Sequence, residues 1–339
     1  MAGMDGQAGP CLLEVERHAA CTPSSPAGSR YRPPGRHAGP RMRGTPAQWA
    51  VDRLLRGLLW LVLRLPYRRR VAAMGWLMSR VVAPLAGWRR RIRDNLAIAW
   101  PDLPPQDVHR LTRQVPDNAG RTLIELYSGA EFIAHARRAR IEGEGLAALE
   151  AARAEGRPVI LVTAHFGNYD AARAALIARG HRMGALYRAM SNPYFNAHYV
   201  RTISAIGTPM FAQGRRGMAE MVRHLKGGGV LGILTDLAAR RGEPLRFFSA
   251  PALTSLVTAE LALKYDALLI PTFSTRMPNG FDFTVELQAP VPHGDPAAMT
   301  QEVNDRLEAK VRANPGQWFW VHRRWKRRRS TQAPPGSRG

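Results

Sequence analysis

Residues 158–170 read PVILVTAHFGNYD, and this stretch decides the fold class of the 339-residue chain. The run PVILVTA, residues 158–164, is apolar throughout, which is typical of a strand buried on both faces of a parallel sheet. Gly167 and Asn168 predict a tight turn directly after it, and Asn168 suits the N-cap of a helix over 169–180. A buried strand, a tight turn and a helix in this order predict an α/β protein.

The alternation of strands and helices continues toward the C-terminus. Further strands are expected over 183–188, 208–212, 230–236, 268–275 and 281–287, and further helices over 94–137, 194–206, 215–226, 255–265, 296–314 and 315–325. Most of these strands are nearly continuous in apolar residues. The sequence therefore predicts a mixed, largely parallel central sheet flanked by helices.

The composition is strongly basic and poor in cysteine. The chain has 49 Lys and Arg against 26 Asp and Glu, a formal net charge of +23. Residues 1–100 hold 17 Arg against five acidic residues, a net of 17 − 5 = +12, and residues 320–339 hold seven cations and no acid. Charge concentrated at both ends predicts a polyanionic partner, either nucleic acid or an anionic membrane surface. Cys11 and Cys21 lie near no His or Cys pair, so we expect no zinc finger, iron–sulfur site or disulfide framework.

Changes in composition along the chain predict four segments. Residues 1–44 are rich in Pro, Gly, Ser and Arg, lack the apolar run of a cleavable signal peptide, and are expected to be disordered. We expect membrane-associating helices over 45–93, an α/β domain over 94–328 and a disordered tail over 329–339.

Two apolar stretches in the second segment predict helices at a membrane surface. LLRGLLWLVLRL, residues 54–65, and VAAMGWLMSRVVAPLAG, residues 71–87, are each followed by an Arg cluster, at 68–70 and 89–93. The first is short and charged for a transmembrane span, which needs about 20 apolar residues, and the second is interrupted by Arg80 and Pro84. A single N-terminal span is kept as an alternative to peripheral or monotopic attachment. Apolar helices bordered by Arg and Trp favour insertion into one leaflet, with these side chains at the headgroups. The alternative is a pair of ordinary core helices with Arg on their exposed sides.

His165 and Asp170 are the strongest candidates for chemistry. His165 directly follows the buried strand, at the edge where open α/β sheets build their sites, and Asp170 begins the next helix. Across this turn the carboxylate can accept a hydrogen bond from one ring nitrogen and leave the other as a general base for a hydroxyl. The spacing is equally compatible with a strand-end histidine and a carboxylate that stabilises a helix start. Asn168 and the backbone N–H groups of residues 167–169 are candidates for an oxyanion hole.

The sequence shows no motif of an activated nucleophile for a covalent intermediate. It has no Gly-x-Ser-x-Gly elbow, and no cysteine lies outside the N-terminal segment. Direct transfer of a group to a hydroxyl therefore fits better than a covalent enzyme intermediate.

The stretch HFGNYD, residues 165–170, resembles the His-x4-acid motif of the glycerolipid acyltransferase superfamily. From about residue 50 to 328 the sequence is similar to the bacterial lipid A late acyltransferases, the lauroyl and myristoyl acyltransferase family. Four further stretches carry this resemblance: YRAMSNPY (187–194), GRRGMAEMVRHLKGGGVLGILTD (214–236), FFSAPALT (247–254) and PGQWFWVHRRWK (315–326). The resemblance implies a glycerol-3-phosphate acyltransferase-like fold. It also implies transfer of a fatty acyl chain from an acyl carrier protein to a hydroxyl of a lipid A precursor, at the cytoplasmic face of the inner membrane.

The resemblance also implies roles for single residues. It makes His165 the general base and Asp170 its orienting partner. Arg188 matches an arginine that follows the second core strand in the family, where it could stabilise oxyanion charge or bind a phosphate. Asp236 matches an acid at a strand end and is expected to shape the acceptor site. No metal or bound cofactor is implied.

The acceptor stays open because the chain departs from the family pattern at three positions. Tyr169, Ala189 and Leu237 stand where Trp, Pro and Gln are frequent. A glycerol phosphate, a mannosyl phosphoinositide or an aminolipid acceptor would use the same pair of side chains.

Weaker candidates lie at other loops. Arg215 opens a helix and could bind phosphate, although an exposed helix start explains it equally well, and Arg276 ends a strand on the same sheet edge as His165. Phe247, Phe248 and Pro251 could line an acyl tunnel or form a packed turn.

The C-terminal segment has two interpretations. Trp318, Trp320 and Trp325, with Arg323 and Arg324, predict a membrane interface, although Trp318 could also belong to the core. The basic run RRWKRRR, residues 323–329, would suit nucleic acid, but no nucleic-acid-binding module accompanies it, so we expect no nucleic-acid partner.

Overall fold

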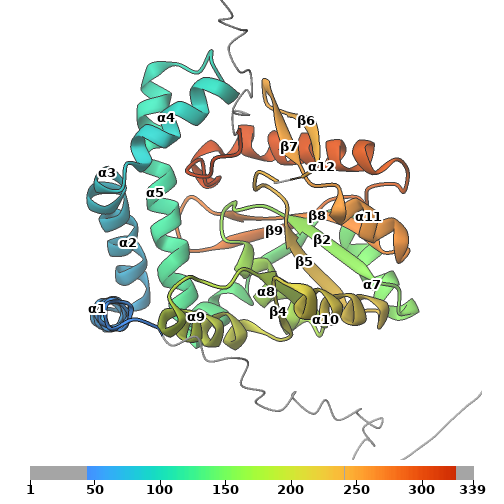
Figure 1. Ribbon diagram of the computed structural model, residues 1–339, viewed down its shortest axis with the longest axis horizontal. Helices are drawn as coiled ribbons and strands as arrows, with labels where there is room; N and C mark the ends of the chain where they lie inside the picture. The colour runs from blue at the N-terminus through green and yellow to red at the C-terminus, as the bar shows by residue number, and fades with distance from the viewer. Residues whose placement is uncertain (1–43, 240, 326–339) are drawn as a thin grey trace, which may run out of the picture. The chain divides into compact units, whose positions relative to one another are not determined.

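The computed structural model describes residues 44–239 and 241–325, and its centre is a seven-stranded sheet in the order β1-β9-β8-β2-β5-β3-β4 (Figure 1). The strands are β1 (Arg140–Glu142), β2 (Val159–Thr163), β3 (Met183–Tyr187), β4 (Met210–Ala212), β5 (Val230–Leu234), β8 (Leu268–Arg276) and β9 (Phe283–Leu287). Only the β8–β9 pair is antiparallel. The predicted mixed, largely parallel sheet is confirmed.

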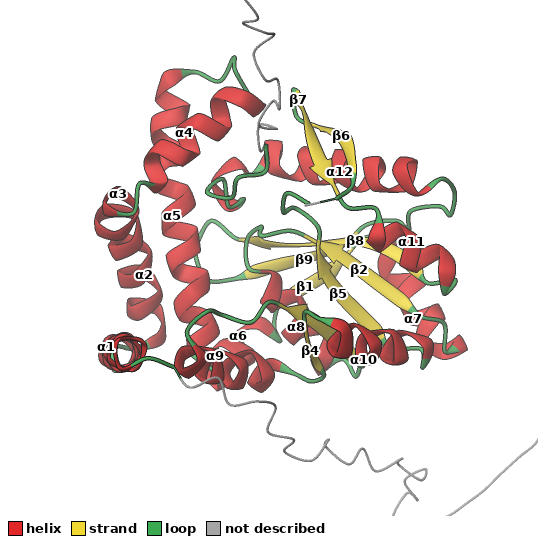
Figure 2. Cartoon of the chain, in the orientation of Figure 1, coloured by secondary structure: helices red, strands yellow, loops and turns green. Residues whose placement is uncertain are grey.

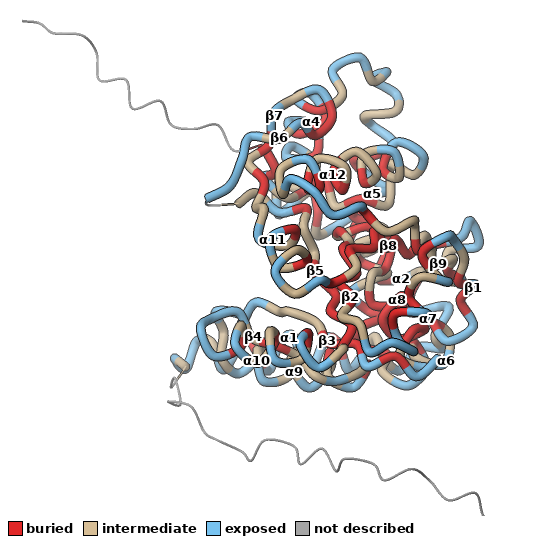
Figure 3. The backbone as a smooth tube through the Cα atoms, turned by 90° about the vertical axis from the view of Figure 1, so that its right-hand side faces the viewer, coloured by how far each residue is buried: buried red, intermediate tan, exposed pale blue. Residues whose placement is uncertain are grey.

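Helices cover both faces of this sheet (Figure 2). One layer holds α6 (Ala130–Ala136), α7 (Gly145–Glu155), α8 (Tyr169–Ala178) and α9 (Pro193–Ile206), and the other holds α10 (Arg215–Lys226), α11 (Val257–Lys264) and α12 (Pro296–Ala313). Successive side chains of β2 pack into opposite layers: Val159 and Leu161 into the first, Ile160 and Val162 into the second. β2 and β8 are consequently buried along most of their length (Figure 3).

The chain before the sheet forms a further group of helices. They are α1 (Pro46–Leu63), α2 (Tyr67–Leu77), the π-helical turn η1 (Met78–Val82), α3 (Ala83–Leu85), α4 (Trp88–Ala99) and α5 (Pro105–Tyr127). α2 packs along α5 at close range, as Figure 1 shows. A Cβ atom on Gly120 would lie 2.5 Å from the carbonyl oxygen of Met74, so this close contact requires glycine.

The two predicted apolar helices are confirmed as helices, with different environments. The second has a buried face on α5, which includes Val71 and Met74, whereas α1 buries only Asp52 and Leu59. Arg70 of the predicted surface cluster is buried and contacts Ser128 and Glu131, so it is not available to a membrane.

Membrane crossing has limited support in the described helices. None of them alone is long and apolar enough to cross a bilayer, and only the bent pair 67–85 and 88–99, which meet at 85°, has the length and composition for a broken crossing.

The predicted helix over 315–325 is wrong. A short 3₁₀ turn, η2 (Pro315–Gln317), is followed by an irregular segment because this stretch is held by contacts with the rest of the domain. Three elements have no predicted counterpart: β1, α7 and the hairpin of β6 (Glu243–Phe247) and β7 (Ala250–Thr254). The predicted extension over 1–44, apart from Gly44, and the predicted tail over 329–339 lie outside the described residues.

Candidate active site

His165 and Asp236 meet at the carboxyl edge of the sheet, where β2 and β5 end side by side. Thr163 pairs with Leu234 in the parallel register, so the residues two positions beyond, His165 and Asp236, come opposite each other. His165 Nδ1 lies 2.8 Å from Asp236 Oδ1, and the His165 backbone N–H donates to Asp236 Oδ2 at 2.9 Å. The carboxylate therefore fixes both the ring and the backbone of His165.

The electrostatics of this pair set the tautomer of the histidine. Complete burial by itself would raise the pKa of Asp236, but the adjacent His165 and its hydrogen bonds outweigh burial and hold that pKa well below its usual range. An ionised carboxylate can only accept hydrogen bonds, so Nδ1 of His165 is the donor. In the neutral ring Nε2 then carries no proton and can act as a base.

The turn after His165 is fixed by its neighbours on both sides. Gly167 has a φ of 54°, and a Cβ atom there would lie 1.8 Å from the carbonyl oxygen of Ser274 in β8. Its N–H donates to the carbonyl of Gln317 at 2.9 Å, and the N–H of Phe319 donates to the carbonyl of His165 at 2.9 Å. The C-terminal segment thus runs antiparallel beside the turn and holds it in place.

The same segment contributes two rings to the site. Trp318 is buried and donates from Nε1 to Asp236 Oδ2 at 2.9 Å. The ring of His322 stands edge-on to that of His165, with 4.5 Å between centroids, and burial together with His165 lowers the pKa of His322 to about 4. His322 is therefore neutral near neutral pH.

The expected position of the C-terminal tryptophans at a membrane interface is wrong. Trp318, Trp320 and Trp325 are all buried and pack on one another and on Phe247. Arg324 is also buried and donates to the Thr254 hydroxyl at 2.7 Å. Large aromatic surfaces gain more from this shared core than from exposure, which is why the segment closes the domain.

His165 lies between two cavities. The first, the helix cavity, has a volume of about 210 Å³ and lies between α5 and the turn, with Leu123, Leu126 and Phe319 in its walls. The second, the sheet cavity, has a volume of about 230 Å³ and lies over β3 and β5. Because His165 lines both, two groups held in separate cavities can meet at its ring.

Asp170 lines both cavities, but its contact differs from the prediction. Its carboxylate pairs with Arg173, with 3.1 Å between Oδ1 and Nε, and the ring nitrogen of His165 that was expected to face it is bound to Asp236. Burial raises the pKa of Asp170, and Arg173 opposes that shift. The expectation that Asp170 orients His165, with Asp236 at the acceptor, is therefore corrected: the pairing of adjacent strands brings Asp236 to the ring.

Arg188 and Arg215 have different positions relative to these cavities. Arg188 directly follows β3, is exposed and lines the sheet cavity together with His165. It also lines a larger pocket of about 580 Å³, the α1 pocket, with Val51 and Phe195. Arg215, which was predicted to bind substrate, is exposed at the start of α10 and lines neither cavity.

Asn168 and Arg276, which were predicted as substrate contacts, belong to a buried network beneath the turn. Asn168 Nδ2 donates to Glu125 Oε2 at 2.8 Å, and its Oδ1 accepts the N–H of Asp170 as the predicted N-cap. Arg276 donates to both Glu125 oxygens, at 2.5 and 2.7 Å, and to Asn118. The network pairs the buried charges of Glu125 and Arg276 and uses one of the two N–H donors of the Asn168 amide.

Two of the three turn amides expected in an oxyanion hole already donate to other carbonyls. The N–H of Gly167 is taken by Gln317, and the N–H of Asn168 donates to the carbonyl of Ser274 at 3.3 Å. Phe247 and Phe248 are buried among the tryptophans, so the packed turn is confirmed and the acyl tunnel at this place is not. Within residues 44–239 and 241–325, no group of three or more His, Cys, Asp or Glu could hold a metal ion.

Two contacts of the site, those of Trp318 and His322, were not predicted from the sequence. The contact of Asp236 with His165 was not predicted either. One signal pointed to that contact: VILVTAH, residues 159–165, and VLGILTD, residues 230–236, end in a polar residue at the same distance from the strand start. Only the pairing of these two strands makes the signal useful.

Comparison with known proteins identifies the family of this chain. Residues 41–327 match the family described as bacterial lipid A biosynthesis acyltransferase. The chain belongs to this family. The match covers the helices before the sheet and the whole α/β region described above.

Individual relatives of this lipid A acyltransferase family member have different acceptors in their names. The lipid A biosynthesis lauroyltransferase of Escherichia coli K12 is 26% identical over 282 residues, which cover 80% of this chain and 90% of that protein. The lipid A biosynthesis palmitoleoyltransferase of the same strain is 24% identical over 281 residues, with the same coverage. A phosphatidylinositol mannoside acyltransferase of Mycobacterium tuberculosis is 25% identical over 185 residues, and the chain spans only 58% of its length.

Proposed function

We propose that this protein moves a fatty acyl chain from the thioester of an acyl carrier protein to a hydroxyl of a lipid A precursor. The observation that carries the proposal is the hydrogen bond of His165 Nδ1 to the buried Asp236, at the junction of two cavities. A base with its free nitrogen between two binding spaces suits direct transfer between two bound substrates. Family membership supports the acyl group and a glycolipid acceptor.

The acyl group can pass directly from donor to acceptor without a covalent enzyme intermediate. Nε2 of His165 takes the proton of the acceptor hydroxyl as its oxygen attacks the thioester carbon, so that a C–O bond forms. The C–S bond then breaks, and the departing thiolate takes the proton from the imidazolium. Asp236 stabilises the imidazolium between these events and keeps its ring oriented.

The sheet cavity fits the acyl donor. Its walls are largely apolar and include Met183, Ile203 and Met210, which suit an alkyl chain. Arg188 at its mouth also lines the α1 pocket, so an exposed cation stands where an acidic carrier protein would deliver the thioester. Arg188 is also the cation available to the carbonyl oxygen as negative charge develops on it.

We also propose that the helices before the sheet rest on the anionic cytoplasmic face of the inner membrane. Leu54 and Leu61 of α1 are 73% and 62% exposed, and Leu85 of α3 is 85% exposed. The exposed apolar residues are concentrated on α1, α2, η1 and α3: Trp49, Val51, Leu54, Leu55, Leu58, Trp60, Leu61, Trp76, Val81 and Leu85. An apolar surface of this extent with Arg beside it favours a bilayer of anionic lipid.

Transfer by the purified protein tests the function. We expect mass spectrometry to detect a lipid A precursor that is heavier by one acyl chain when the protein is supplied with acylated carrier protein. His165→Ala should reduce the rate by about 10²- to 10⁴-fold while the protein remains folded. Transfer to a mannosyl phosphoinositide alone would change the acceptor and keep the chemistry. Transfer to neither lipid, or full activity in His165→Ala, would overturn the proposal.

A further inference from the structure

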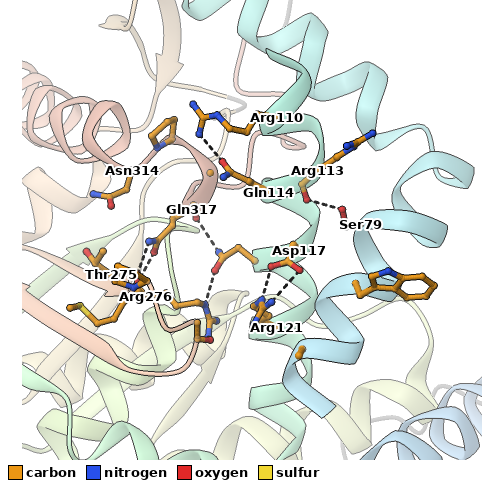
Figure 4. Close-up of a pocket in the computed structure, with 18 of the residues that line it drawn as sticks. Ser79, Arg110, Arg113, Gln114, Asp117, Arg121, Thr275, Arg276, Asn314 and Gln317 are labelled. Atoms are coloured by element: carbon orange, nitrogen blue, oxygen red, sulfur yellow. Dashed lines mark hydrogen bonds and ion pairs between the residues drawn. The ribbon is translucent and has the colours of Figure 1, made fainter. Parts of the chain in front are cut away.

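A groove rich in arginine lies beside α5. It has a volume of about 960 Å³ and is bounded by α2 and η1, by α5, by the turn after β8 and by the segment that follows α12. Figure 4 shows Arg110, Arg113 and Arg121 on α5, with Asn314 and Gln317 across from them. Successive arginines are about one and two turns apart, so the three share one face of the helix.

The charges around the groove are unbalanced. Five arginines and one acidic residue, Asp117, line it, a net of 5 − 1 = +4. Three of these arginines have partners: Arg276 is paired with Glu125, Arg121 with Asp117, and Arg110 with Asp107.

Arg80 and Arg113 are the two exceptions. Over the described part of the chain neither guanidinium has a hydrogen bond or an ion pair, and both are exposed. They come from different elements that are held together, because the Ser79 hydroxyl donates to the carbonyl of Arg113 at 2.9 Å. Two unpaired guanidinium groups beside one cavity are a site for an anion with several acceptor oxygens.

The groove adjoins the helix cavity at His165. Asn118 and Gln317 line both the groove and the helix cavity, and His165 lines the far side of that cavity. At the opposite rim of the groove, Trp76 is 60% exposed and belongs to the apolar surface of the helices before the sheet. A molecule in the groove would thus have apolar surface on one side and the base on the other.

We propose that this groove binds a phosphate group of the glycolipid acceptor, with Arg80 and Arg113 as its ligands. The inference rests on the proposed function and adds the place where the acceptor headgroup is held. A phosphate fits better than the acidic face of a carrier protein because the site is concave and borders the apolar surface, where a lipid headgroup would enter. The carrier protein would then bind at Arg188 and the α1 pocket.

The double variant Arg80→Ala with Arg113→Ala tests the site. Both side chains are exposed, and the contact of Ser79 uses only the Arg113 backbone, so the fold should be kept. We expect KM for a phosphorylated acceptor to rise about 100-fold, about tenfold for each guanidinium. KM for the acyl carrier protein and for the dephosphorylated acceptor should stay at the wild-type values. The matched control, Arg137→Ala with Arg138→Ala, removes the same charge from an exposed stretch outside the groove.

Two outcomes would overturn this inference. An equal rise in KM for the phosphorylated and the dephosphorylated acceptor would show that the groove does not bind the phosphate. A rise in KM for the carrier protein alone would assign the groove to the donor.

A binding measurement separates failure of the groove from failure of the proposed function. The His165→Ala variant is mixed with the phosphorylated lipid in non-ionic micelles, and binding is compared with and without the two groove substitutions. A loss of binding of about 100-fold supports the groove even if the wild-type protein transfers nothing. Unchanged binding overturns it even if transfer occurs.

Discussion

The chemistry proposed for His165 depends on which carboxylate holds its ring. Asp236 makes contact with both the ring and the backbone of His165 and also accepts a hydrogen bond from Trp318, whereas Asp170 is engaged by Arg173. A buried carboxylate with three donors stays ionised and keeps the imidazole in one tautomer. Asp170 in turn neutralises Arg173, which would otherwise be a buried charge without a partner.

His322 makes stability depend on pH. Its pKa is about 4 in the folded protein against 6.5 when unperturbed, so the unfolded chain binds the proton first as pH falls. The stabilisation is complete above pH 6.5 and is lost between pH 6.5 and about 4, which amounts to roughly 3 kcal/mol. We expect His322→Gln to remove this part of the pH dependence of the unfolding free energy. The exposed His109→Gln should keep the wild-type profile, and a His322→Gln profile that matched it would contradict the assignment.

The sequence allows His165 to be predicted but not its partner. His165 directly follows a long apolar strand, which is a local signal, whereas Asp236 lies 71 residues away and meets it only because β2 and β5 are neighbours. Strand order depends on the packing of the whole domain. Asn168 shows the complementary case, since its role as N-cap is local and was predictable, while its contact with Glu125 was not.

The C-terminal segment after α12 acts as an element of the site although it has almost no regular structure. Phe166 and Trp318 form an isolated antiparallel bridge, which places the indole over Asp236 and His322 beside His165. A helix was expected over 315–325, but the partners of its aromatic and basic side chains lie in other elements. Local pattern therefore fails where tertiary contacts determine the backbone.

Trp318→Phe measures the contribution of this segment. The substitution removes a hydrogen bond to a buried carboxylate, so we expect the free energy of unfolding to fall by about 1.5–3 kcal/mol. Trp320→Phe is the matched control, because the Nε1 of Trp320 donates to a neutral carbonyl, that of Pro315, at 2.9 Å. Chemical denaturation of both variants gives the comparison. An equal or smaller loss for Trp318→Phe would show that its bond to Asp236 contributes little.

Neighbouring cavities of the fold share lining residues. The α1 pocket shares Arg188 with the sheet cavity, the sheet and helix cavities share His165, and the arginine groove shares Asn118 and Gln317 with the helix cavity. Donor and acceptor can therefore approach the base from different sides. The sequence predicted the chemistry near His165, but this order of cavities depends on how α1, α5 and the sheet pack.

The exposed face of α1 should determine membrane binding. We expect the combined replacement of Leu54, Leu58 and Leu61 by Ser to weaken binding to vesicles of anionic lipid by roughly 10²- to 10³-fold. Binding weakens because apolar surface is lost. This surface is already exposed in the fold, so the free energy of unfolding should change little. Val257→Ser, an exposed apolar position on α11, is the control. Co-sedimentation measures both, and unchanged binding of the triple variant would contradict this role of α1.

We propose that Asp236 holds the His165 ring so that Nε2 is the base. The tautomer of His165 in the Asp236→Asn variant tests this role of Asp236. Two N–H groups, from the His165 backbone and Trp318, donate to Oδ2, so the amide oxygen of Asn would take that place and turn its NH₂ toward Nδ1. Nitrogen NMR of ¹⁵N-histidine-labelled protein should find the ring proton on Nδ1 in the wild type and in Asp170→Asn, and on Nε2 in Asp236→Asn. An Nδ1 proton that persists in Asp236→Asn and disappears in Asp170→Asn would contradict the account.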